Sequence, residues 1–201
     1  MSDLADLCGQ IERCQKCRLA QGRTMAVPGA GADDAEIMFV GEAPGFHEDQ
    51  QGIPFVGAAG NFLNQLLASI DLSRQDVYIA NVIKCRPPDN RDPQPDEIAA
   101  CRPYLDRQIE LIKPKMIVTL GRFSMQLAFS GVTISRIHGM PKKMGDIVYF
   151  PLFHPAAALH QSRYRSLIEH DFQKIPQILA DLQAVEEQEQ APPPAEQLSL
   201  F

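Results

Sequence analysis

The sequence predicts an α/β protein in which helices cover both faces of a parallel sheet. Four short apolar runs, at residues 37–40, 77–83, 116–120 and 147–153, have the length of buried strands. The segments between them carry apolar residues three and four positions apart, the spacing of amphipathic helices. Strands that alternate with helices across short turns form parallel sheets. The 201 residues suffice for one such domain with a sizeable core.

The remaining segments fit this alternation. Residues 84–95 contain four prolines and must be irregular, whereas Pro95 suits the first turn of the helix that follows. Residues 22–36 are expected to form a loop, and residues 131–146 a loop or a hairpin. We expect helices over residues 3–13, 58–70, 95–112, 122–129 and 162–184.

Charge and composition restrict the location of the protein more than its partners. No apolar run approaches the length of a membrane span, and the acidic N-terminus lacks a signal-peptide pattern, so we expect a cytoplasmic protein with reduced thiols. The net charge is −6, but residues 186–201 contain four glutamates and no Lys or Arg. The other residues therefore carry only −2, which permits a local basic face, so net charge does not decide whether nucleic acid binds.

A loop directly after the first strand carries the strongest indication of a binding site. The segment Gly41-Glu42-Ala43-Pro44-Gly45-Phe46-His47-Glu48-Asp49 cannot continue a strand and is unfavourable inside a helix. Taken alone, it could be an ordinary strand-to-helix turn. However, the first, second and fourth strands end near Glu42, Asn81 and His154, and the carboxyl ends of parallel strands lie at one edge of the sheet. The three side chains can therefore share one cleft.

The cysteines suggest a metal centre. Cys14 and Cys17 form a C-x-x-C pair, and Cys85 and Cys101 follow farther along the chain. Four thiolates in a reducing compartment suit zinc or an iron–sulfur cluster, and their spacing does not distinguish between the two. The alternative is that Cys85 and Cys101 are inert buried residues. Cys8 lies on the apolar face of the first helix, and we assign it to the core.

Taken together, these motifs resemble the iron–sulfur uracil-DNA glycosylases of family 4. The resemblance extends from about Cys14 to Leu179, and the motifs follow in the order of that family. They are Gly41-Glu42-Ala43-Pro44-Gly45-x-x-Glu48-Asp49, Gly52-x-Pro54-Phe55-Val56-Gly57-x-Ala59-Gly60, Asn81-Val82-x-Lys84-Cys85-Arg86-Pro87-Pro88, Asn90-Arg91-Asp92-Pro93, Ala100-Cys101-Arg102-Pro103-Tyr104-Leu105 and His154-Pro155-Ala156. Phe46-His47 departs from the commoner polar or acidic residues. No histidine stands in the segment 90–95, where a related branch inserts one to trap DNA covalently, so we expect ordinary turnover.

The resemblance implies a three-layer α/β/α sandwich around a four-stranded parallel sheet. It further implies a 4Fe–4S cluster held by the four cysteines, and a monofunctional DNA glycosylase that removes uracil and leaves an abasic site for base excision repair. We therefore expect a glycosylase domain over residues 1–185. We expect the protein to be a monomer and not to bind membranes. Two rival hypotheses are a cluster-bearing DNA-binding or polymerase-associated module without catalysis, and a zinc-stabilised hydrolase of another nucleotide.

The resemblance also suggests roles for residues of the pocket. Phe55 would stack on the flipped base, and Asn81 would read uracil, since its amide supplies an acceptor for N3–H and a donor for O4. His154 would stabilise the uracil anion, and Glu42 would orient water or counter the charge of the sugar cation. Glu48 matches the position that excludes the methyl group of thymine, and backbone groups of Gly41 and Ala43 would complete the pocket.

DNA contacts and the tail complete the predictions. Arg86, Arg91, Lys142, Lys143, Arg163 and Arg165 are candidates for backbone contacts, and Leu159, in an expected loop at 157–159, is a candidate wedge into the vacated stack. Residues 186–201 are expected to be disordered, as their Gln, Glu and Pro content indicates. Their last five residues, Gln197-Leu198-Ser199-Leu200-Phe201, resemble the motif by which bacterial replication and repair proteins bind the sliding clamp.

Overall fold

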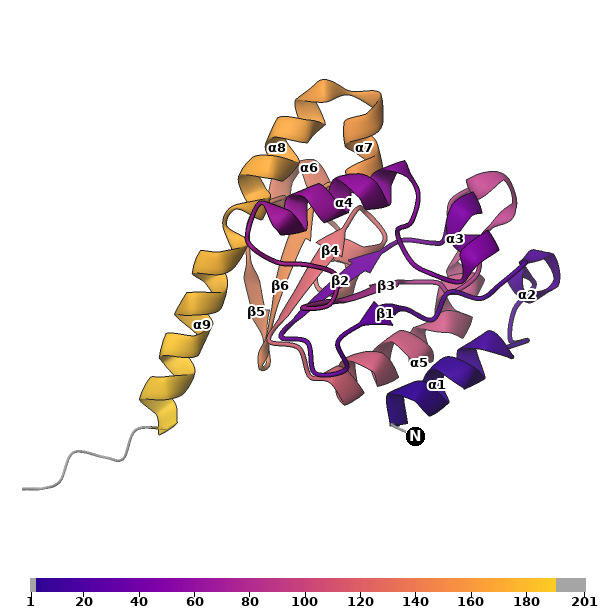
Figure 1. The fold of residues 1–201 in the computed structure, drawn as a ribbon, viewed down its shortest axis with the longest axis horizontal. Helices are drawn as coiled ribbons and strands as arrows, with labels where there is room; N and C mark the ends of the chain where they lie inside the picture. The colour runs from indigo at the N-terminus through magenta and orange to yellow at the C-terminus, as the bar shows by residue number, and fades with distance from the viewer. Residues whose placement is uncertain (1–2, 191–201) are drawn as a thin grey trace, which may run out of the picture.

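The protein is a three-layer sandwich with a six-stranded sheet in the middle (Figure 1). The computed structural model describes residues 3–190, and side chains as far as residue 185. The strand order is β1-β3-β2-β4-β6-β5. The four central strands run parallel, as predicted, and the α/β/α fold is confirmed. They are β3 (Tyr78–Asn81), β2 (Ile37–Gly41), β4 (Met116–Leu120) and β6 (Ile147–Leu152).

Two short antiparallel strands at the edges of the sheet extend it beyond the predicted four. β1 (Ala30–Gly31) pairs with β3, and β5 (Lys142–Met144) forms a hairpin with β6. The two residues of β1 are too few to produce a periodic pattern, so that segment was expected to be a loop. Lysines occupy β5, which discourages further strands from adding to that edge.

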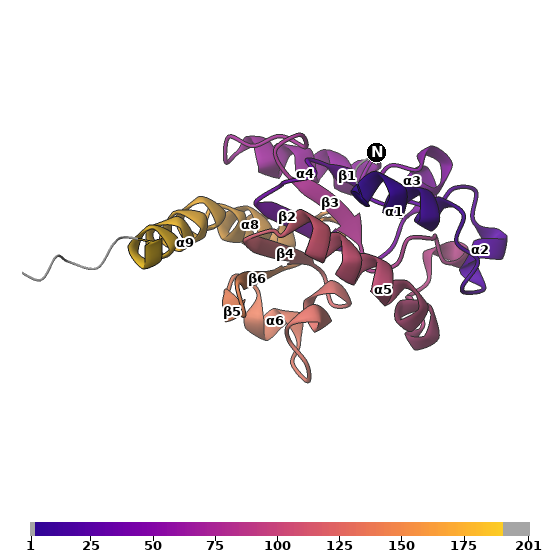
Figure 2. The same cartoon turned by 90° about the horizontal axis from the view of Figure 1, so that it is seen from below.

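Helices from distant parts of the chain cover the two faces of the sheet. The helices α4 (Ala58–Ala68), α8 (Ser162–Phe172) and α9 (Ile175–Gln190) lie on one face, and α1 (Asp3–Glu12) and α5 (Pro95–Ile112) on the other (Figures 1 and 2). Each face has its own apolar core, since Phe39 packs toward α4 and α8 whereas its neighbour Met38 packs toward α1 and α5. Both side chains are fully buried, which explains why the strands are continuously apolar.

The C-terminal region differs from the expected single helix over 162–184. It forms α8 and α9, because Pro176 lacks an N–H and cannot continue the first of them. Residues 157–159, expected in a loop, lie in α7 (Pro155–His160), which Pro155 begins at a favourable position. α9 continues to Gln190, five residues past the expected end of the domain, since its Glu and Gln residues favour helix. The motif at 197–201 lies outside the described residues.

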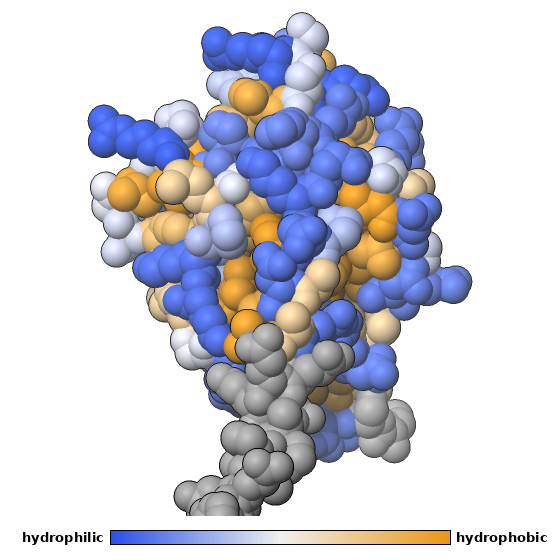
Figure 3. Space-filling view, turned by 90° about the vertical axis from the view of Figure 1, so that its left-hand side faces the viewer, coloured by the Kyte–Doolittle hydropathy of each residue, from blue (hydrophilic) through white to orange (hydrophobic). Residues whose placement is uncertain are grey.

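The connections contain only short helical segments. The expected helix over 122–129 is a single 3₁₀ turn, η2, which follows Gly121 at the end of β4. The short segments are α2 (Leu19–Gly22), α3 (Phe46–Gln51), η1 (Pro88–Asn90), η2 (Ser124–Leu127) and α6 (Ile134–Ile137). The side of the molecule that carries α9 and β5 is mostly hydrophilic with scattered apolar patches (Figure 3). Within residues 3–190, no helix is both long and apolar enough to cross a membrane.

Candidate active site

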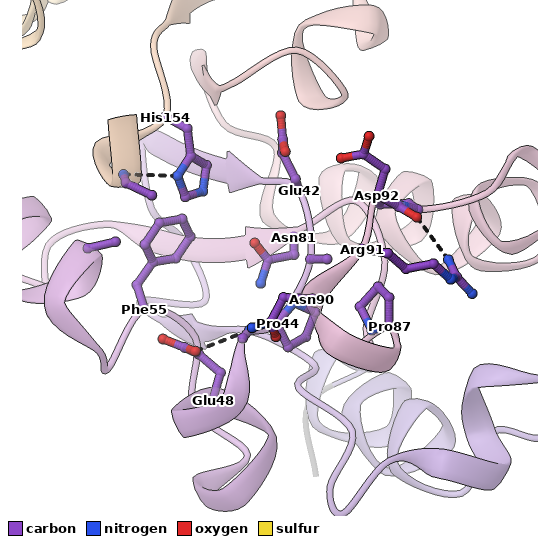
Figure 4. A pocket seen from close by; sticks show the side chains of 15 residues that line it. Glu42, Pro44, Glu48, Phe55, Asn81, Pro87, Asn90, Arg91, Asp92 and His154 are labelled. Carbon is purple, nitrogen blue, oxygen red and sulfur yellow. Dashed lines mark hydrogen bonds between the residues drawn. The ribbon is translucent and has the colours of Figure 1, made fainter. Parts of the chain in front are cut away.

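A cavity of about 320 Å³ lies where β2, β3 and β6 end, beside the proline-rich segment that follows β3 (Figure 4). It has the size of a small-molecule site. The structure brings Glu42, Asn81 and His154 together here, as the order of the strands predicts, and adds Phe55 and Glu48 from the loop and helix between β2 and α4. The full lining is Glu42, Ala43, Pro44, Gly45, Glu48, Phe55, Ala59, Asn81, Pro87, Asn90, Arg91, Asp92, Pro93, His154 and Ala156.

Asn81 offers an unused hydrogen-bond acceptor in this cavity. It is the last residue of β3, pairs in register with Gly41 of β2 and is 1% exposed. Among the described residues, its Oδ1 has no hydrogen-bond partner. A Cβ on Gly41 would lie 2.4 Å from that oxygen, so the absence of a side chain at Gly41 leaves room for the amide. Buried acceptors without partners are uncommon, and this one indicates a ligand that donates a hydrogen bond.

Phe55 forms one wall of the cavity. Its ring is stacked on the His154 imidazole, with 5.5 Å between centroids and 25° between planes. Its backbone is in the left-handed region, with φ of 53°, which is rare for an aromatic residue. Two glycines permit this placement: a Cβ on Gly60 would lie 1.8 Å from the Phe55 carbonyl oxygen, and one on Gly41 would lie 2.6 Å from the Phe55 ring.

His154 is held as a neutral imidazole whose second nitrogen is free to donate. It caps α7, since its Nδ1 accepts a hydrogen bond from the Ala156 N–H at 3.1 Å. Burial lowers the pKa of His154 to about 4, so the ring is uncharged at neutral pH. A neutral ring that accepts at Nδ1 carries its proton on Nε2. The cap thus selects the tautomer that can donate to a bound ligand.

Glu42 lies at the end of β2 next to the end of β4. The Phe123 N–H donates to its Oε1 at 3.2 Å, and a Cβ on Gly121 would lie 2.4 Å from the same oxygen. Gly121 has φ of +101°, a conformation that the turn after β4 requires and that favours glycine. Because it has no side chain, it also leaves room for the Glu42 carboxyl group. Burial raises the pKa of Glu42, while the hydrogen bond from Phe123 and the nearby Arg122 guanidinium oppose that shift. The third central strand thus contributes to the site, although its sequence carries no candidate site residue.

Glu48 uses its carboxylate to bind backbone groups on both sides of the cavity. Its Oε2 accepts from Gly45 N–H at 3.1 Å, at the start of α3. Its Oε1 accepts from Val56 and Gly57 N–H groups at 2.9 and 3.0 Å, directly after Phe55. Glu48 lines the pocket, as expected, and also ties α3 to the segment that carries Phe55.

The four candidate metal ligands line a second, small cavity between α1, the end of β3 and α5. Cys14, Cys17, Cys85 and Cys101 all border it, whereas Cys8 is separate and contacts Tyr78. Three of the sulfurs accept N–H donors: Lys16 N–H donates to Cys14 at 3.5 Å, Arg23 Nη1 to Cys85 at 3.0 Å and Lys84 N–H to Cys101 at 3.3 Å. Such donors stabilise thiolates and tune iron–sulfur clusters.

Within the part of the chain that the structure describes, no three Cys, His, Asp or Glu side chains form a group that could hold a single ion. The four cysteines nevertheless border one cavity, so they are the side chains that a metal centre here would use. Thiolates suit both zinc and iron–sulfur clusters.

The residues predicted to contact DNA have varied surroundings. Arg91 borders the pocket, but its guanidinium forms a two-pronged ion pair with the buried Glu97, at 2.6 and 2.9 Å. Arg86 Nε donates to Asn90 at 2.8 Å, and its guanidinium lies over the exposed Phe46 ring at 5.2 Å. Lys142 and Lys143 are on the edge strand β5, and Arg163 and Arg165 are on α8. Leu159 is exposed on α7, the helix that His154 caps.

Several residues of the site had no distinguishing signal in the sequence. Arg74, in the connection between α4 and β3, donates to the carbonyl of Phe55, but a single arginine in a polar loop indicates nothing about its target. Asp92 and Asn90 line the pocket and could have been suspected from the polar residues among the prolines. The role of Gly121 beside Glu42 depends on a contact between two strands that are distant in sequence.

Comparison with known proteins places the chain in a family. Residues 28–183 match the Uracil DNA glycosylase superfamily. A "Type-4 uracil-DNA glycosylase" of Sulfurisphaera tokodaii is 51% identical over 87% of this chain and 84% of its own length. Proteins of the same name from Saccharolobus solfataricus and Archaeoglobus fulgidus are 47% and 48% identical, over 90% and 87% of this chain and 88% and 92% of their own lengths. The chain belongs to the uracil-DNA glycosylase superfamily.

Proposed function

We propose that this protein is a type-4 uracil-DNA glycosylase. It extracts uracil from DNA into the pocket, hydrolyses the N-glycosidic bond and leaves an abasic site for base excision repair. The observation that carries this proposal is the buried Asn81 Oδ1, which has no partner within the described residues and belongs to a side chain that lines a cavity walled by an aromatic ring. A flat base with an N–H donor is the ligand that such a site fits.

Recognition of the base combines stacking with two hydrogen bonds. Phe55 stacks on the extracted base, a contact worth roughly 1–3 kcal/mol. Asn81 accepts from uracil N3–H through Oδ1 and donates to O4 through its amide nitrogen. Cytosine presents the opposite pattern, an acceptor at N3 and a donor at N4, and is rejected. Glu48, at the wall of the pocket, excludes the methyl group of thymine, and backbone groups of Gly41 and Ala43 complete the surface around the base.

Bond cleavage makes an anionic uracil and a cationic sugar, and the two catalytic side chains act on these charges. His154 donates from Nε2 to uracil O2 as negative charge develops there, and a neutral imidazole suffices because the proton is already aimed inward. Glu42 lines the same pocket, between His154 and Asp92 in the view of Figure 4, and its carboxylate orients the attacking water or offsets the positive charge of the sugar. Water adds to C1′, and the proton it loses balances the charge on the departing base.

Cys14, Cys17, Cys85 and Cys101 are the residues that would hold a 4Fe–4S cluster. When bound, it would supply a cross-link that ties the N-terminal helix and the segment after β3 to α5. Cys85 lies only four residues after Asn81, so this cross-link would be close to the pocket. The absorption of the purified protein at about 400 nm, together with its iron and sulfide content, would distinguish a cluster from zinc without any measurement of activity.

DNA binding rests on surfaces beside the pocket. Arg86, Arg91 and Arg163 contact the backbone, and the exposed Leu159 fills the space that the base leaves in the stack. The protein acts as a cytoplasmic monomer, and Gln197-Leu198-Ser199-Leu200-Phe201 tethers it to the sliding clamp. Retention by an immobilised clamp should disappear when residues 197–201 are deleted, and undiminished retention would contradict the tether.

The experiment that tests the function uses single- and double-stranded oligonucleotides with one uracil, thymine or cytosine at the same position. Incubation followed by alkaline cleavage should cut only the strand that contained uracil. A matched variant, Asn81→Ala, should bind the same DNA without cutting it. If the wild-type protein binds uracil-containing DNA but leaves it intact, the non-catalytic DNA-binding module is the better description.

A further inference from the structure

The backbone on either side of Phe55 is bound by two side chains of opposite charge. Arg74 Nη1 donates to the Phe55 carbonyl oxygen at 3.0 Å, and its Nη2 donates to the Pro54 carbonyl oxygen. On the other side, Glu48 Oε1 accepts from Val56 and Gly57 N–H groups at 2.9 and 3.0 Å. Carbonyl oxygens thus meet a cation and N–H groups meet an anion, so each charge suits the backbone groups that it binds. Hydrogen bonds with an ionised partner are the stronger kind.

The conformation at Phe55 is one that needs such support. Its φ of 53° is unfavourable for a residue with a side chain, and such conformations persist where the surroundings over-determine them. Glu48 comes from α3 and Arg74 from the connection between α4 and β3, so two separate elements restrain the segment. Arg74 is itself positioned by Asn64 of α4, whose Oδ1 accepts from Nη1 at 3.3 Å.

We propose that Arg74 is a positioning residue for uracil recognition, which, with Glu48, holds Phe55 in the left-handed conformation that presents its ring to the extracted base. Arg74 does not line the pocket and acts only through Phe55. Without its guanidinium, the carbonyl oxygens of Pro54 and Phe55 lose their charged donor, and Phe55 relaxes toward an ordinary backbone conformation. The ring then leaves its place opposite His154, and capture of the base weakens. This inference rests on the proposed function, because it concerns the base that the pocket binds.

Single-turnover kinetics on a uracil-containing single strand measures the effect. For Arg74→Met we expect the half-saturating enzyme concentration to rise about tenfold, which corresponds to about 1.4 kcal/mol, with a smaller change in the rate at saturation. Arg74→Lys should fall between wild type and Arg74→Met, because an ammonium group can reach one carbonyl but lacks the two-pronged geometry. Arg107→Met is the matched control: Arg107 is an exposed arginine on α5, paired with Glu110, on the opposite layer. It should behave as wild type.

Affinity for DNA that already contains an abasic site distinguishes a role of Arg74 in positioning Phe55 from a general effect on the DNA-binding surface. That DNA has no base to stack, so Arg74→Met should bind it as wild type does. Equal losses on uracil-containing and abasic DNA would overturn the proposal, because they would show that Arg74 supports the DNA surface as a whole.

A double-mutant cycle with Phe55→Ala tests whether Arg74 acts through Phe55. With the ring absent, Arg74→Met should add less than a twofold effect, since residues that act through one another are not additive. A further full tenfold loss in the Phe55→Ala background would overturn the proposal. If Arg74→Met does not fold, the same cycle is measured with Arg74→Lys. Uracil release by the wild-type protein tests the proposed function by itself, so failure of the cycle and failure of that function are distinguishable.

Discussion

Replacement of His154 tests the chemical step most directly. Removal of one hydrogen-bond donor to a developing anion lowers rates about 10²–10³-fold. His154→Ala also removes the stacking of the imidazole on the Phe55 ring. At a centroid distance of 5.5 Å, such a pair contributes about 0.5–1.5 kcal/mol to stability. His154→Asn also loses the stack but is the sharper variant, because asparagine is a good N-cap and can still accept from Ala156 N–H. Its amide is too short to reach a base that the imidazole Nε2 reaches.

The assay is single-turnover cleavage at saturating enzyme, which isolates chemistry from DNA binding and product release. We expect His154→Asn to lose about 10²–10³-fold in rate at nearly wild-type stability. A rate within threefold of wild type would refute the assignment of His154 as the donor to the leaving base. A loss that appeared only in the half-saturating concentration would refute it as well, since it would place His154 in binding and outside the transition state.

The pH dependence provides an independent check on the neutral ring. With the pKa of His154 lowered to about 4, its titration should produce no inflection in the wild-type rate between pH 6 and 8. An inflection of the rate near pH 6.5 that is absent in His154→Asn would show that His154 takes part as an imidazolium. It would contradict the neutral tautomer inferred from the cap. Stability follows the same shift: the folded pKa lies below the ordinary 6.5, so stability is full above pH 6.5. It falls as the pH drops toward 4, by at most about 3 kcal/mol.

Four further variants examine other parts of the site. Asn81→Asp should relax selectivity, which is measured as cytosine release from a cytosine-containing strand; no release above wild type would contradict the reading of Asn81. Glu42→Gln should lose about a hundredfold in rate and abolish the fall in rate at acid pH that protonation of Glu42, whose pKa burial raises, would cause; an unchanged pH profile would exclude Glu42 as the titrating group. Leu159→Ala should slow uracil release from duplex more than from single-stranded DNA, because only a duplex has a stack to refill. Lys84→Met should cost about 2 kcal/mol in urea unfolding, because it leaves Asn81 O and Gln108 Oε1 without the ammonium that binds them at 2.9 and 2.6 Å.

The order of apolar runs predicted the layers of the fold well because a buried parallel strand must be apolar on both faces. The same logic predicted that Glu42, Asn81 and His154 meet, since each lies at the carboxyl end of a central strand or within two residues after it. It could not predict where the last helix breaks, because the decisive residue, Pro176, suits the first turn of a helix as well as the end of one. The expected loop at 157–159 was wrong for a related reason: Pro155 began a helix there.

Prediction of individual charged residues was limited by partners that are distant in sequence. Arg91 lies in a motif that suggested DNA contact, and that motif did not indicate its ion pair with Glu97. Arg74 lies in no motif, and its contact with the Phe55 carbonyl depends on how α4 is packed. Charge in a sequence shows what a side chain can bind, whereas the fold determines which partner lies within reach.

The selectivity of the pocket follows from the same buried oxygen that suggests the function. In the protein without DNA, Asn81 Oδ1 is buried from solvent and has no partner within the described residues, and uracil N3–H would supply one. Cytosine in the same position would bring its unprotonated N3 to this acceptor and leave both atoms unpaired away from water, at about 1–3 kcal/mol for each. Two such losses correspond to roughly 30-fold to 10⁴-fold discrimination. The amide can impose this penalty only while it stays in place: the Lys84 ammonium binds the backbone carbonyl of Asn81 at 2.9 Å, and Gly41, which has no side chain, leaves the room that the amide occupies.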